Sequence, residues 1–227
     1  MATEAERFLR KARESLASAE ADIEAGRHNS AANRAYYAAF QAGIAALSHS
    51  AIRPDRGWDH KFVNSQFSGK LIWRRKVFSA GLADMLTTLF EVRVSADYRP
   101  DDVPARTATR SVNRAATLIS DVTEFLKPTM RESRTEYGEE MATRISTREK
   151  SLDYVEEVRG LINARFPSAE FEVVEFGPKD FRLIVWVDGE DATIEVSEST
   201  AVRRTEILVK TGVWVVVLAL DRTQRDN

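Results

Sequence analysis

Residues 33–48 read NRAYYAAFQAGIAALS, a run that holds a single glycine and no proline. Its large apolar side chains recur at steps of three and four residues, which is the spacing of one face of an α-helix. These positions are Tyr36, Phe40, Ile44 and Leu47. The many alanines around them allow neighbouring helices to approach closely. The run therefore predicts a helix over about residues 29–48 in a helical bundle.

Four further segments on either side of this run carry apolar residues with the same helical period. They predict helices over about residues 3–25, 58–68, 79–97 and 103–126. Pro54 and Gly57 mark a loop after the second helix, and Pro128 ends the last one. Residues 1–127 are therefore expected to form an all-α antiparallel helical bundle.

The remaining residues follow a different pattern. Residues 128–147 (PTMRESRTEYGEEMATRIST) are polar and are interpreted as a linker. Residues 148–227 predict a helix over 148–165, strands over 171–176, 181–188 and 192–196, a helix over 199–211 and a strand over 213–220. The last strand is expected in the centre of a sheet because it is apolar on both faces. The order α-β-β-β-α-β indicates a small α+β domain.

Composition narrows the possible functions. The chain has 227 residues, three histidines and no cysteine, so we expect no disulfide, no thiolate chemistry, no metal site and no cofactor. Residues 1–127 carry 19 basic and 15 acidic residues, and residues 128–227 carry 14 and 20. Neither part has a net charge large enough to indicate nucleic-acid binding by itself. The charged N-terminus and the short apolar runs predict a cytoplasmic protein that does not bind membranes.

Four stretches of the bundle, taken in order, resemble the HEPN superfamily of helical-bundle proteins. They are NRAYYAAFQAGIAALS, HKFVNSQF from His60, LFEVRVSADY at residues 89–98, and ATRSVNRAATLISDVTEFL at residues 108–126. The most similar subgroup has a Tyr-Tyr-Ala helix two, a histidine before helix three, and an Arg-x-x-x-Asp-Tyr ending to helix four. The resemblance covers about residues 5–127.

The resemblance implies two kinds of function. Many HEPN proteins are metal-independent RNA endonucleases that act as toxins or in phage defence, with two copies meeting in a homodimer. Some work with a nucleotidyltransferase-type antitoxin protein. Others are non-catalytic modules that bind a nucleotide, RNA or a protein partner. Apolar side chains at Trp58, Phe62, Phe67 and Trp73, which the small bundle is expected to expose, also favour a homodimer.

The sequence departs from the catalytic HEPN pattern, in which a histidine follows an arginine by a few residues. Here Arg93 is followed by Asp97 and Tyr98 and by no histidine. Arg93 and Asp97 are four residues apart, so an ordinary helix salt bridge is one interpretation. The other is a polar groove. His60, either a structural residue at the start of a helix or a proton-transfer group, could converge with Arg93 in space. His60, Arg93, Asp97 and Tyr98 are the candidate catalytic residues.

Two sets of arginines are candidates for nucleic-acid binding. Arg53 and Arg56 precede His60, and the spacing Arg53 to His60 fits the family motif in a loop rather than on a helix. Arg106, Arg110 and Arg114 recur every four residues along one helix face. This arginine ladder could contact phosphates, or it could be solvated and paired with acids.

The segment FGPKDFRLIVWVDG at residues 176–189 faintly resembles the core of a small nucleotidyltransferase. The Gly-Ser and Asp-x-Asp elements of that fold are absent, since Gly177 is followed by Pro178 and a whole strand separates Asp180 from Asp188. A degenerate nucleotidyltransferase and a generic accessory domain both fit this pattern.

Overall fold

A computed structural model describes residues 2–127 and 148–224 of the chain. The first part holds the helices α1 (Glu4–Glu24), α2 (His28–His49), α3 (His60–Gln66), α4 (Met85–Tyr98) and α5 (Ala105–Phe125). The second part holds α6 (Arg148–Arg165), β1 (Glu170–Gly177), β2 (Asp180–Val187), α7 (Glu190–Thr211) and β3 (Trp214–Asp221). The predicted linker, residues 128–147, lies outside the described residues.

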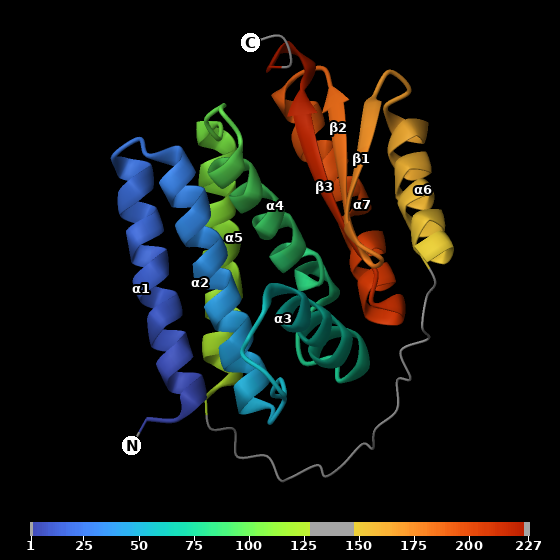
Figure 1. Cartoon of the computed structure of the whole chain (residues 1–227). Coiled ribbons are helices and arrows are strands. Elements are labelled where there is room, and N and C mark those ends of the chain that lie inside the picture. The colour runs from blue at the N-terminus through green and yellow to red at the C-terminus, as the bar shows by residue number, and fades with distance from the viewer. Residues whose placement is uncertain (1, 128–147, 225–227) are drawn as a thin grey trace.

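The N-terminal part is a bundle in which α2 packs against α1, α4 and α5 (Figure 1). The small side chains of α2 explain its place, because Ala35, Ala38, Ala42 and Ala45 are fully buried and let the neighbouring helices come close. Thr3 and Glu6 form a capping box that begins α1. The predicted helical bundle is therefore confirmed, with helix ends within a few residues of those expected for α1, α2 and α5.

Two bundle segments differ from the sequence-based expectation. After α3 the chain continues as a π-helix over Phe67–Arg74, and a 3-10 turn at Ala80–Leu82 precedes α4. Phe67 is fully buried, and Trp58, Phe62 and Trp73 pack partly buried against the same core. Phe67 is therefore not part of the exposed apolar surface expected from these four residues, and the other three side chains are only partly exposed.

The C-terminal part is a three-stranded sheet in the order β1-β2-β3. β1 pairs antiparallel with β2, and β2 pairs parallel with β3 through the crossover helix α7. Alternate residues of β2 and β3, such as Leu183 and Val215, share a core with residues of α6 and α7, such as Val158 and Ile207. Helices α6 and α7 thus cover one face of the sheet, as the alternation of side chains in strands requires. The small α+β domain is confirmed.

The expected strand at residues 192–196 is wrong, because this segment is the beginning of α7. Its β-branched residues favour a strand locally. However, Glu190 and Asp191 suit the positive end of a helix, and the buried residues Val196, Thr200 and Ile207 continue with a helical period. Gly212 ends the helix in the left-handed conformation, with φ of 74°.

The expected central position of β3 is also wrong, since β3 is an edge strand of the sheet. Both of its faces are nevertheless buried. One faces α6 and α7, while Val216 and Leu218 on the other face pack against Val94 of α4. In Figure 1, α4 lies on the side of the bundle that faces the sheet. The apolar residues on the second face of β3 are therefore explained by packing against the bundle, and not by a central position in the sheet.

A buried ion pair joins the two parts of the chain. Glu91 of α4 and Arg204 of α7 have side chains that are 4% and 1% exposed and are bonded to each other. Glu91 also accepts hydrogen bonds from Ser197 Oγ at 2.5 Å and from the backbone N–H of Val217 at 3.0 Å. Every partner of Glu91 in this set comes from the C-terminal domain, so the bundle and that domain share a polar core.

No helix among the described residues is both long enough and apolar enough to cross a membrane.

Candidate functional site

The first component of the candidate site is a hydrogen bond between helices α2 and α3. Asp59 caps α3 by accepting the backbone N–H of Phe62 at 2.8 Å, and His60 is the first residue of the helix. The Tyr36 hydroxyl of α2 lies 2.5 Å from His60 Nδ1. Two rings, Phe40 and Phe90, enclose the imidazole at centroid distances of 4.8 and 5.4 Å. The imidazole is therefore held in one orientation with Nδ1 engaged.

Burial and a nearby positive charge set the protonation of this pair. The pKa of His60 lies below its usual value of 6.5, because burial and then the charge of Arg93 disfavour the imidazolium, against an opposing effect of Asp59. The pKa of Tyr36 is raised well above its usual range, chiefly by burial. At pH 7 the pair is therefore neutral, and His60 can accept a proton.

The second component of the site is the Arg93–Asp97 pair of α4. Arg93 Nη2 lies 2.7 Å from Asp97 Oδ2, with side chains 17% and 24% exposed. Asn33 of α2 donates to Asp97 Oδ1 at 2.6 Å, and the Arg93 guanidinium lies 5.7 Å from the centre of the Tyr37 ring. Arg93 Nε is buried without a hydrogen-bond partner. The arginine is thus fixed by helix α2 while one of its donors remains unused.

Phe90 links the two components. Its ring contacts the His60 ring and it lies one turn before Arg93 on α4, and the charge of Arg93 acts on both His60 and Tyr36. The convergence of His60 with Arg93 in one catalytic site stays a prediction. Tyr98 ends α4 with 70% of its surface exposed. The catalytic role of these four residues stays a prediction.

Four of the five arginines proposed to bind nucleic acid are paired with acids. Arg53 pairs with Glu4 at 3.0 Å, and Arg56 lies exposed in the loop before α3. The arginine ladder of α5 faces α7: Arg106 pairs with Asp191, and Arg110 and Arg114 pair with Glu198 at 3.2 and 2.7 Å. Of the two interpretations, pairing with acids is the one observed here. Phosphate binding by these arginines stays a prediction.

Sequence reasoning missed Tyr36 as the partner of His60. The two residues lie 24 positions apart on different helices, so no spacing rule links them. The only signal in the sequence is the Tyr-Tyr pair itself, which places hydroxyl groups on the second helix. Asn33 of α2 donates a hydrogen bond to Asp97 of α4 and so links two helices of the bundle.

No group of three or more histidine, aspartate and glutamate side chains within residues 2–127 and 148–224 is arranged to hold a metal ion. The residues brought together by the fold are instead one neutral imidazole, one phenol and one arginine. Such a set can move a proton and stabilise negative charge on a phosphate.

Comparison with protein-family models identifies a HEPN domain over residues 5–133. A search of curated proteins gives no match to the chain. The matched region covers more than half of the chain and contains α1 to α5, with Tyr36, His60 and Arg93. The chain therefore belongs to the HEPN domain family.

Proposed function

We propose that this HEPN protein is a metal-independent endoribonuclease. His60 takes a proton from the RNA and Arg93 stabilises the charge that develops on the phosphate. The observation that supports this function is an imidazole whose pKa is lowered by burial and by the charge of Arg93, and which Tyr36 holds in one orientation. Helix α3 thereby supplies the histidine that the sequence of α4 lacks.

The proposed step uses one tautomer of His60. With its proton on Nδ1, His60 donates to the Tyr36 oxygen, and Nε2 is free to accept the proton of a ribose 2′-hydroxyl. The 2′-oxygen then bonds to the adjacent phosphorus and the bond to the 5′-oxygen breaks. The leaving oxygen takes a proton from water, which gives a 2′,3′-cyclic phosphate and a 5′-hydroxyl. The hydroxide formed takes the proton from His60, which returns the imidazole to its neutral form. Arg93 stabilises the doubly charged phosphorus centre.

Independence from metal is part of this proposal. It is supported by the lack of any group of three or more potential ligand side chains among the described residues. We therefore expect cleavage to persist in the presence of a chelator.

A non-catalytic module that binds a nucleotide, RNA or a protein is the second candidate function. It is favoured by the ion pair of Arg93 with Asp97 and by the acids that neutralise the arginine ladder. In this role Arg93 anchors a ligand phosphate, and a toxin–antitoxin or regulatory system is the setting that the family suggests. A nucleotidyltransferase-type antitoxin and a second copy of the chain are the proposed protein partners.

The test is incubation of total RNA with the purified protein, with and without a chelator. If the protein is a ribonuclease, we expect fragments with cyclic phosphate ends both with and without the chelator. We also expect loss of cleavage in His60→Gln and full cleavage in His28→Gln, a matched control at the start of α2. Cleavage by His60→Gln at the full rate refutes the site. An inactive wild type whose RNA binding is weakened by Arg93→Glu supports the binding module instead.

A further inference from the structure

A groove of about 350 Å³ lies beside the candidate site, where the sheet meets α3 and α4. Lys61, which follows His60, and Phe90, which contacts the His60 ring, form its bundle side. Phe176, Arg182 and Trp214 form its other side. The groove is therefore built jointly by the HEPN bundle and the C-terminal domain.

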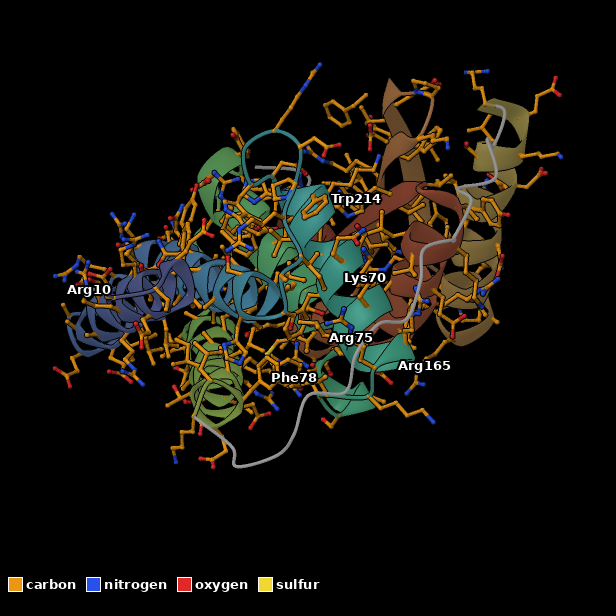
Figure 2. The ribbon with its side chains drawn as sticks, turned by 90° about the horizontal axis from the view of Figure 1, so that it is seen from below. Arg10, Lys70, Arg75, Phe78, Arg165 and Trp214 are labelled. Atoms are coloured by element: carbon orange, nitrogen blue, oxygen red, sulfur yellow. The ribbon has the colours of Figure 1, made fainter. Side chains whose placement is uncertain are left out.

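Aromatic rings connect this groove to His60. The Phe90 ring lies 5.4 Å from the imidazole on one side and 5.0 Å from the Trp214 ring on the other. Figure 2 shows Trp214 of β3 beside α3. Phe176, at the end of β1, is 64% exposed, which is unusual for so large an apolar side chain. A ligand in the groove can therefore reach aromatic surface within a few ångströms of the His60 ring.

Cationic side chains accompany these rings. The Arg182 guanidinium lies 4.7 Å from the centre of the Phe176 ring, and its Nε is buried without a hydrogen-bond partner. Lys61 pairs with Asp180 at 2.7 Å, so the lining carries one uncompensated positive charge. A planar aromatic ligand with an attached anion matches this combination of rings and charge.

We propose that this groove binds an unpaired nucleobase, carried by single-stranded RNA or by a free nucleotide. Every nucleobase presents a flat face that stacks on aromatic and guanidinium groups, whereas the bases of a duplex are already stacked on each other. The groove is also of the size that small-molecule sites have. The choice of RNA as the carrier rests on the proposed function, while the groove itself does not. The C-terminal domain thereby becomes part of the substrate site.

Binding of a short labelled 2′-O-methyl RNA to the full chain, followed by fluorescence anisotropy, tests this proposal. Methylation blocks the 2′-hydroxyl, so affinity is measured without cleavage. Phe176→Ala is the informative variant because its exposed ring contributes little to folding. Val173→Ala is the matched control, on the same strand and 39% exposed. We expect Phe176→Ala to weaken single-strand binding about fivefold or more, and the control to change it less than about twofold.

Three comparisons decide the outcome. The same RNA annealed into a duplex should bind wild type no better than the single strand binds Phe176→Ala. Adenosine 5′-monophosphate should compete through the groove and ribose 5-phosphate should not. If only the nucleotide binds in a Phe176-dependent manner, the carrier is a free nucleotide. Equal affinities of wild type and Phe176→Ala for both ligands overturn the groove as a base site.

These results are separable from the ribonuclease proposal. Phe176-dependent binding in a protein that cleaves no RNA supports the groove and refutes catalysis. Cleavage that depends on His60, together with affinities that do not depend on Phe176, refutes the groove and supports catalysis.

Discussion

Replacing Glu91 with alanine should destabilise the protein severely, because it leaves the charge of Arg204 buried without its counter-ion. Arg204 would keep two neutral acceptors, Thr200 Oγ1 at 3.1 Å and the Ser197 carbonyl at 2.9 Å, and the charge of Asp84, which is not hydrogen-bonded to it. Breaking a buried ion pair in this way costs about 3–5 kcal/mol. The backbone N–H of Val217 also loses its acceptor, at a further cost on the order of 1 kcal/mol.

Urea unfolding followed by circular dichroism measures this loss. The expected change is a large fraction of the roughly 5–15 kcal/mol that stabilises a typical domain. Glu198→Ala is the control, because Glu198 pairs with arginines of α5 at a partly exposed site and should cost less than about 1 kcal/mol. Glu91→Leu combined with Arg204→Met should restore most of the stability, since no unpaired charge remains. A loss in Glu91→Ala as small as that of the control would refute the buried network.

Three further predictions concern the site and the assembly. Cleavage should rise with pH with a midpoint below pH 6.5, since His60 must be neutral and its pKa is lowered by burial and by Arg93; the midpoint of the His60 titration followed by NMR should move upward in Arg93→Gln, and an unchanged midpoint would separate Arg93 from His60. A protease site inserted within residues 128–147 should yield two fragments that co-elute in gel filtration, because Glu91 and Arg204 join them; separate elution would contradict that interface. Light scattering should show a homodimer, as the family suggests, and a monomer at high micromolar concentration would contradict it.

The helical half of the fold could be predicted because its apolar residues recur at helical spacing in long runs, as in α2 and α5. Prediction failed where tertiary contact decided the outcome. Residues 192–196 have strand-like composition but belong to α7, and β3 looks central because α4 covers its second face. Glu91 and Arg204 are charged residues on helices, and nothing local marks them as buried.

Only some residues of the candidate site could be predicted from the sequence. His60 and Arg93 were selected through the family resemblance, and their proximity depends on how α3 and α4 pack. Tyr36 and Asn33 act through partners on other helices, so no local pattern could pair them. The groove at Phe176 and Trp214 requires the docking of the C-terminal domain, which residue spacing does not encode.

The central claim is that the His60 imidazole moves the proton in RNA cleavage. The most direct measurement is the cleavage rate of His60→Gly with and without added imidazole, in the presence of a chelator and with folding checked by circular dichroism. The account predicts that His60→Gly is inactive alone and that imidazole, filling the space beside Tyr36, restores part of the wild-type rate. A His60→Gly variant that cleaves RNA as fast as the wild type without imidazole would contradict it.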